Sequence, residues 1–248
     1  MKKRDTRTAM LIGVGGLEKL KSSRVAVFGI GGVGGHAVDA LVRAGIGEID
    51  LFDNDTVSET NINRQLIATY DTVGEYKTEA FKKRIESINP DCRVNLHTLF
   101  VTPNLIEEMS LCDYDYVIDA IDTVSSKIAL AVKAERERVN IISSMGTGNK
   151  LDPSKFEITD IYKTSVCPLA RVMRTELRKR GVKSLKVLYS KEEPRKPLTF
   201  TFENNASVDP REENRQKSVP ASISFVPAAA GLFIAGEVIR HIIGDNGC

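Results

Sequence analysis

The glycine-rich turn Gly29-Ile30-Gly31-Gly32-Val33-Gly34 directly follows the apolar run Val25 to Phe28. In a strand–turn–helix unit the first glycine permits a tight turn, the second removes a Cβ where phosphate approaches, and the last permits close helix packing. The helix N-terminus offers free N–H groups and a positive dipole to an anion. A second predicted strand, Glu48 to Phe52, is followed directly by Asp53. This is about the place where an acidic residue binds the ribose hydroxyls in such units. The pattern predicts a nucleotide-binding βαβ unit with these contact residues: Gly29, Gly31, Gly32, Gly34 and Asp53.

The residues after Asp53 favour ATP over NAD. A dehydrogenase needs a neutral pocket for nicotinamide, but here Arg64 and Lys77 flank a polar cluster formed by Asn61, Asn63 and Gln65. Such charges suit a triphosphate and the charge that develops at phosphorus during adenylyl transfer. Taken alone, Arg64 can be interpreted as a solvated loop arginine and Lys77 as a surface lysine that opens a helix. Their spacing favours the phosphate role.

Asp122 follows a predicted buried strand, Tyr116 to Ala120. A carboxylate at such a strand end can reach Mg²⁺ or order the phosphates of bound ATP. The alternative is an N-cap for the helix that begins at Ser125. Asp119, on the same strand, is predicted to be a packing carboxylate outside the site.

The combined motif resembles the MoeB/ThiF/HesA family, the bacterial relatives of ubiquitin-activating enzymes. The resemblance covers the chain from Arg7 to about Ile243, and its residues are Asp53-x-Asp55, Asn61-x-x-Arg64-Gln65, Lys77 and Ile121-Asp122. It implies adenylation of a carboxylate with Mg-ATP. The resemblance also implies that Arg64, Lys77 and Asp122 are catalytic and that Asp122 binds Mg²⁺. The further nucleotide-binding residues that it implies are Asp55, Asn61 and Gln65.

Arg7 resembles the N-terminal arginine that family members insert into the ATP site of a partner chain. This resemblance implies a homodimer with an arginine finger in trans. The alternative is a frayed, charged terminus.

The C-terminal half resembles the branch of this family that dehydrates threonylcarbamoyladenosine next to the tRNA anticodon. The matching segments are Cys167 to Met173 with the Arg-rich helix after it, Val187 to Ser190, and Ser222 to Pro227. The branch implies ATP-dependent ring closure through an acyl adenylate, with release of AMP and pyrophosphate, and leaves open a sulfur-relay partner. Two alternatives remain: adenylation of the C-terminal Gly-Gly of a sulfur-carrier protein, and a nucleotide-binding protein without turnover.

A basic helix is predicted from Leu169 to Arg180, and Arg171, Arg174 and Arg178 fall on one of its faces. We interpret this face as a path for tRNA phosphates. The formal net charge of the chain is only +2, so its overall charge does not indicate nucleic acid. An ordinary solvated helix face is the alternative.

The four cysteines form no CxxC pair and have no histidine at metal-ligand spacing, so we expect no structural zinc. Their scarcity and the lack of a signal peptide predict a reducing cytoplasm. Cys167 precedes Pro168 at a helix start. No base is paired with it, so a structural or substrate-proximal role is favoured over a nucleophile.

Alternating strands and helices predict an α/β, Rossmann-like doubly wound fold with a mainly parallel sheet and a C-terminal extension of strands and helices. At 248 residues and 42% hydrophobic content, a single domain over 1–248 is expected. The polar, proline-bearing segment of about 191–220 is predicted to be a mobile crossing loop. Pro227 to Ile243 is apolar, but Glu237 and Arg240 interrupt it, so we predict a buried helix that packs on the sheet or at the dimer interface, with no membrane partner expected. A membrane anchor is the alternative.

Overall fold

The computed structural model describes residues 2–198 and 220–245. Its centre is a seven-stranded sheet with the order β3-β2-β1-β4-β5-β7-β6, in which β6 alone pairs antiparallel with its neighbour. The other neighbouring strands pair in parallel, as the alternation of elements predicts. The strands are β1 (Arg24–Phe28), β2 (Glu48–Phe52), β3 (Arg93–His97), β4 (Tyr116–Asp119), β5 (Ile141–Ser144), β6 (Phe156–Asp160) and β7 (Lys186–Ser190).

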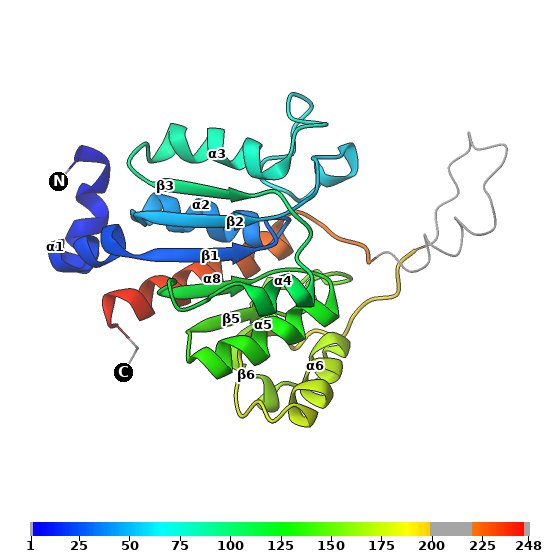
Figure 1. Cartoon of the computed structure of the whole chain (residues 1–248). Helices are drawn as coiled ribbons and strands as arrows, with labels where there is room; N and C mark the ends of the chain where they lie inside the picture. Colours follow the sequence, from blue (N-terminus) through cyan, green and yellow to red (C-terminus); the bar gives the residue numbers. More distant parts are fainter. Residues whose placement is uncertain (1, 199–219, 246–248) are drawn as a thin grey trace.

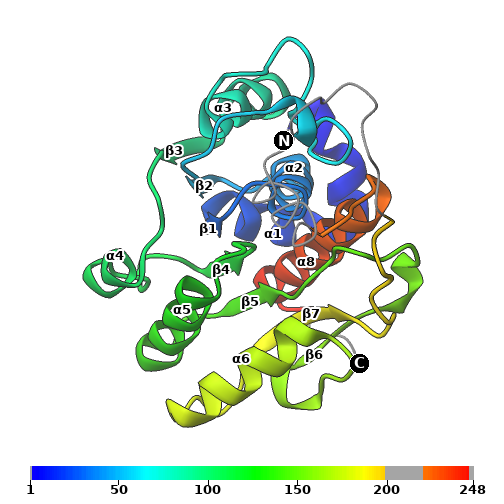
Figure 2. The same cartoon turned by 90° about the vertical axis from the view of Figure 1, so that its right-hand side faces the viewer.

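Helices cover both faces of the sheet (Figures 1 and 2). One face carries α2 (Gly34–Ala44), α3 (Lys77–Ile88) and α8 (Phe225–Ile243), with α1 (Thr6–Ser22) beyond α8. The opposite face carries α4 (Pro103–Glu108), α5 (Val124–Glu137) and α6 (Pro168–Lys179). Short 3₁₀ turns complete the described elements: η1 (Lys3–Asp5), η2 (Glu59–Asn61), η3 (Pro153–Lys155) and η4 (Ile161–Lys163). This arrangement confirms the predicted doubly wound α/β fold.

The central strand β1 shows why the sequence adopts a parallel sheet. Val25, Ala26, Val27 and Phe28 are all fully buried, because helices lie against both faces of the strand. A continuous apolar run without alternation is typical of such strands. The carboxyl ends of β1, β2 and β4 therefore meet at one edge, where the following loops converge.

The predicted helices Leu169 to Arg180 and Pro227 to Ile243 agree with α6 and α8 within two residues. Strand β3 ends at His97, where the Leu99 N–H donates to the His97 carbonyl at 3.0 Å and turns the chain. The N-terminal helix is kinked at Gly13, where φ is 75° and ψ is 166°. Most of the predicted crossing loop, residues 199–219, lies outside the described residues.

The helix α8 is long and apolar enough to cross a membrane by length and composition alone. In the fold it packs against α2 at small residues: a Cβ on Gly231 would lie 2.3 Å from the Val33 carbonyl oxygen. Val226, Ala230 and Ile234 are fully buried. We therefore assign α8 as a core helix.

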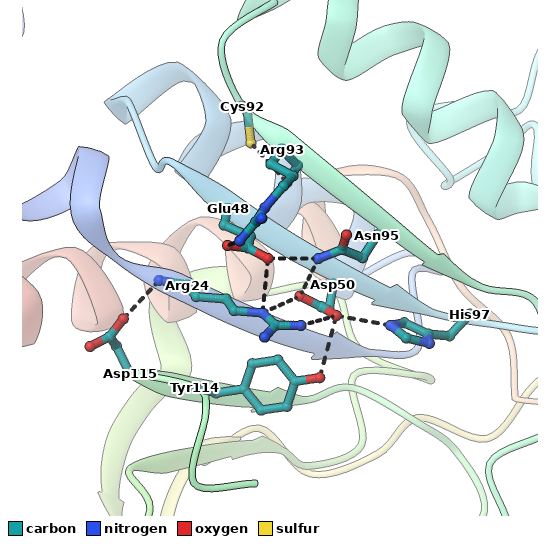
Figure 3. A network of polar contacts seen from close by, with 9 residues as sticks. All are labelled: Arg24, Glu48, Asp50, Cys92, Arg93, Asn95, His97, Tyr114 and Asp115. Atoms are coloured by element: carbon teal, nitrogen blue, oxygen red, sulfur yellow. Dashed lines mark hydrogen bonds and ion pairs between the residues drawn. The ribbon is translucent and has the colours of Figure 1, made fainter. Parts of the chain in front are cut away.

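Charged and polar side chains from β1, β2 and β3 form a network on one face of the sheet (Figure 3). Asp50, which is fully buried, accepts hydrogen bonds from Arg24 at 2.8 and 2.9 Å, from Asn95 at 3.0 Å and from Tyr114 at 3.3 Å, and its Oδ1 lies 2.8 Å from His97 Nε2. Burial by itself raises the pKa of Asp50, but the hydrogen bonds from His97, Arg24 and Asn95 outweigh burial and hold that pKa well below its usual range.

Candidate active site

A cavity of about 710 Å³ opens at the carboxyl ends of β1, β2 and β4. This volume lies within the usual range for small-molecule sites. Ten of the predicted site residues, contributed by five separate segments, have side chains or backbone in its wall. They are Gly29, Gly31, Gly32, Asp53, Asp55, Asn61, Arg64, Gln65 and Lys77, and Asp122 joins them from the loop after β4.

The glycines of the turn have different structural reasons. Gly29 has a φ of 83°, and a Cβ there would lie 2.7 Å from the Ala120 carbonyl oxygen. A Cβ on Gly34 would lie 1.9 Å from the Gly29 carbonyl oxygen, so Gly34 is required for packing and does not line the cavity. Its predicted nucleotide contact stays a prediction. A Cβ on Gly31 would make only an ordinary van der Waals contact with Gln65, whose Nε2 lies at 3.6 Å, so the protein leaves room beside Gly31.

Asp53 holds the glycine-rich turn and the following loop together. Its Oδ2 accepts the Ile30 N–H at 3.0 Å and its Oδ1 accepts the Asp55 N–H at 2.9 Å. Burial raises the pKa of Asp53 above its usual value, because it outweighs the Lys77 charge and these N–H groups, which lower that pKa. Asp53 therefore shapes the cavity wall.

Lys77 is buried, with 5% of its surface exposed, so its interpretation as a surface lysine is wrong. It begins α3, where the helix dipole disfavours a cation. Its Nζ lies 2.7 Å from Asp55 Oδ2 and 3.8 Å from Asp53 Oδ1, and these carboxylates compensate its charge. The fold therefore keeps a charged lysine at the cavity wall.

The segment from Asn61 to Gln65 places three functional groups around the glycine turn. Asn61 Oδ1 accepts the Ser58 N–H at 3.1 Å and closes a capping box around η2. Arg64 Nη1 donates to the Thr60 carbonyl at 2.9 Å, so this guanidinium is anchored beside the cavity. Gln65 is 8% exposed, and its Oε1 has no hydrogen-bond partner among the described residues. A buried amide oxygen without a partner is costly, and a bound ligand would satisfy it.

Asp122 is exposed in the cavity wall and accepts a hydrogen bond from Thr123 Oγ1 at 3.4 Å. The N-cap position of α5 is Thr123, without a side-chain cap bond, so the capping interpretation of Asp122 is wrong. Asp119 is fully buried and pairs with Lys127, as the packing prediction requires.

Arg7 is not brought to this cavity. It lies exposed on α1, which Figure 1 places at the end of the sheet opposite the carboxyl ends of the strands. Only a second chain is able to supply Arg7 to the site, so its role in trans stays a prediction.

The basic helix α6 also lies outside the cavity, and its arginines differ in exposure. Arg171 is exposed, whereas Arg174 Nη1 donates to the Thr164 carbonyl at 3.0 Å. The Arg178 guanidinium lies over the Tyr162 ring, 5.3 Å from its centroid. Two of the three arginines therefore also hold η4 against α6.

Cys167 occupies the N-cap position of α6 and is 2% exposed. It packs in an apolar cluster that includes Ile128, Met145 and Met173. Such packing is consistent with the favoured structural role.

The sequence interpretation missed several cavity residues, above all Phe100, whose side chain is 57% exposed. Leu99, Val101, Thr147 and Ser222 also line the cavity. A phenylalanine in the loop after an edge strand could have indicated a ligand contact. The apolar run Leu99 to Val101, however, resembles a continuation of the strand. The aromatic and aliphatic side chains of this wall are suited to a flat base.

Within residues 2–198 and 220–245 no three His, Cys, Asp or Glu side chains gather as a metal-binding group. A second cavity of about 360 Å³ lies elsewhere, lined among others by Ser23, Cys112, Glu137 and His241. None of the predicted site residues lines it.

Comparisons with known proteins agree with this geometry. Residues 4–247 match the model of the ThiF family. The tRNA threonylcarbamoyladenosine dehydratase of Bacillus subtilis (strain 168) is 43% identical over 241 residues, which are 97% of this chain and 94% of that protein. Two crystal structures of the E. coli enzyme TcdA are also similar. The AMP complex has a TM-score of 0.86 at 32% identity and the ATP complex 0.84 at 33%, and each comparison covers 98% of this chain and 94% of that chain. This chain belongs to the ThiF family.

Proposed function

We propose that this protein is an ATP-dependent tRNA threonylcarbamoyladenosine dehydratase, built as a single adenylation domain. The observation that carries the proposal is the convergence of Arg64, Lys77, Gln65 and Asp122 on one cavity beside the glycine-rich turn. The similarity to dehydratases over nearly the whole chain selects this reaction within the family.

The cavity fits ATP on observations of its own. Gly31 leaves open space where a Cβ would otherwise stand, and Gln65 Oε1 is a buried acceptor without a partner among the described residues. The α2 N-terminus at Gly34 directs its dipole toward this end of the sheet. We assign the base to the wall formed by Leu99, Phe100 and Val101, and the ribose to the side of Asp53.

Charged side chains divide the work of phosphate activation. Arg64 and Lys77 stabilise the negative charge that grows on the phosphates, and Arg7 of a second chain adds to them. Asp122, exposed in the wall, would hold Mg²⁺, which supplies charge neutralisation for the triphosphate when bound.

The chemistry proceeds in two steps. The carboxylate of threonylcarbamoyladenosine attacks the α-phosphorus of ATP, an O–P bond forms, and pyrophosphate leaves. A nucleophilic atom of the same modified nucleotide then attacks the activated carbonyl carbon, closes a ring and expels AMP. Because the second step is intramolecular, the chain has to supply positioning rather than a covalent intermediate. The burial of Cys167 supports this division.

A homodimer completes the proposed site. Near Arg7, α1 exposes Met10 (82%), Leu11 (85%) and Val14 (61%), and apolar side chains this exposed favour a protein contact. We assign the tRNA path to α6, where Arg171 is free of the contacts that hold Arg174 and Arg178. A cytoplasmic setting follows from a tRNA substrate, and a sulfur-relay protein is a further candidate partner.

Release of AMP from ATP tests the proposed function. We expect AMP formation with tRNA that carries threonylcarbamoyladenosine, and none above background with the same tRNA lacking the modification. The second product to measure is the dehydrated nucleoside, by mass. Pyrophosphate release driven instead by a carrier protein that ends in Gly-Gly, with AMP retained on the carrier as an acyl adenylate, would assign the chain to the carrier-protein alternative.

A further inference from the structure

A buried ion pair lies just behind the cavity wall, and the steps described above do not use it. Lys127 Nζ lies 3.0 Å from Asp119 Oδ2, and both side chains are 0% exposed. Lys127 belongs to the first turns of α5, where the helix dipole disfavours a cation. A fully buried lysine at such a place needs strong compensation.

The pair holds both backbone polar groups of Ile121. Lys127 Nζ donates to the Ile121 carbonyl at 3.2 Å, and Asp119 Oδ1 accepts the Ile121 N–H at 3.3 Å. Ser143 Oγ donates to Asp119 Oδ2 at 2.5 Å and fixes the carboxylate from β5. Ile121 is thus held directly by Asp119 of β4 and Lys127 of α5, while Ser143 of β5 fixes the Asp119 carboxylate.

Ile121 directly precedes Asp122, and both line the cavity, whereas Lys127 and Asp119 do not. We propose that Lys127 and Asp119 are positioning residues, which fix the Ile121 peptide so that the Asp122 carboxylate stays at the cavity wall. The proposal rests on the metal role proposed for Asp122. The buried charge pair then determines how strongly Mg²⁺ increases the affinity of the site for ATP.

The same helix provides a matched comparison. Lys133 is also buried, at 4% exposure, and its Nζ contacts the Glu107 carbonyl at 2.7 Å and Glu137 Oε1 at 3.1 Å. It therefore combines a backbone carbonyl and a carboxylate as Lys127 does. None of its contacts reaches the cavity.

The test separates positioning from charge balance. Lys127→Met alone strands the Asp119 charge and risks unfolding, so it is combined with Asp119→Asn, whose remaining oxygen still accepts the Ile121 N–H. This double variant is neutral but lacks the donor to the Ile121 carbonyl. Lys127→Arg keeps the charge with a different donor geometry and serves as a second variant. Lys133→Met with Glu137→Gln is the control.

Calorimetry then gives the dissociation constant of ATP with MgCl₂ and with EDTA, together with melting temperatures. We expect the Mg²⁺ enhancement of ATP affinity to fall at least fivefold in the Lys127/Asp119 double variant and at least threefold in Lys127→Arg. In the control variant this enhancement stays within twofold of wild type. Asp122→Asn, which removes the proposed Mg²⁺ ligand, gives the reference value for complete loss of the enhancement. A wild-type enhancement in either folded Lys127 variant would overturn the proposal. If the wild-type chain forms no AMP with modified tRNA, the proposed function fails, while calorimetry still decides this inference.

Discussion

Lys77 Nζ lies between two carboxylates, 2.7 Å from Asp55 Oδ2 and 3.8 Å from Asp53 Oδ1. The lysine is buried, whereas the side chain of Asp55 is 60% exposed. The positive charge of the buried lysine is thus compensated by a carboxylate whose side chain is largely exposed. In the proposed site a triphosphate would compete with Asp55 for the lysine, so we expect nucleotide binding to affect the conformation of the loop after β2.

Removal of either phosphate-facing cation is expected to stop catalysis without unfolding the chain. Arg64→Ala and Lys77→Ala should each lower AMP formation by about two orders of magnitude or more, because charge develops on the phosphates in the transition state. Lys83→Ala is the control on the same helix, since that side chain is 67% exposed and pairs with Glu75. Near-normal turnover in either site variant, measured as AMP release, would contradict the site.

Substitutions at two glycines of the turn should affect ATP binding and folding separately. Gly31→Ala places a methyl group in the open cavity, so we expect ATP affinity to fall while the melting temperature stays near wild type. Gly34→Ala forces a Cβ to within 1.9 Å of the Gly29 carbonyl, so we expect destabilisation by about 1 to 3 kcal/mol. Titration calorimetry and thermal melts distinguish the two. Equal melting temperatures for both variants would contradict the assigned roles.

The strand–turn–helix unit could be predicted from the sequence, because the conformation of a turn depends on residues close to it in the chain. The positive φ of Gly29, the start of α2 at Gly34 and the end of β2 at Phe52 follow from residues within a few positions of each other. The packing role of Gly34 also follows from the turn, and the structure confirms it.

Long-range contacts were beyond such reasoning. Lys127 lies in a helix of mixed polarity, and nothing nearby in sequence shows that α5 buries it against Asp119. Likewise, the burial of Lys77 depends on Asp55, 22 positions away. Phe100 was missed because an apolar run after a strand resembles more strand.

Cys167→Ser should keep most of the activity. Because the activated carbonyl is consumed within the substrate, the reaction needs no thioester on the enzyme. The thiol is buried in an apolar cluster, so a moderate loss of stability is expected alongside normal AMP release. Loss of turnover with unchanged adenylate formation would favour the covalent, sulfur-transfer alternative.

Asp50 predicts a stability that depends on acid pH. Burial opposes its ionisation, but hydrogen bonds from His97, Arg24 and Asn95 hold its pKa below the usual range. A depressed folded-state pKa contributes stability above the unfolded pKa of about 4, and this contribution is lost as the pH falls below that value. Asp50→Asn should therefore melt lower than wild type at pH 7, and the difference should shrink toward pH 3. A difference that is independent of pH would contradict this assignment.

The basic helix predicts a salt-dependent interaction with tRNA. Replacement of Arg171, Arg174 and Arg178 by glutamate should weaken tRNA binding and flatten its salt dependence, because fewer counterions are released. Arg174 and Arg178 also hold η4, so the triple variant should melt lower, whereas Arg171→Glu tests the exposed position without that complication. Each lost phosphate contact should reduce the slope of log affinity against log salt by about 0.9. Arg43→Glu on α2, 56% exposed, carries the same charge change as a control. ATP affinity should stay unchanged throughout, and a wild-type salt slope in Arg171→Glu and in the triple variant would exclude α6 as the tRNA path.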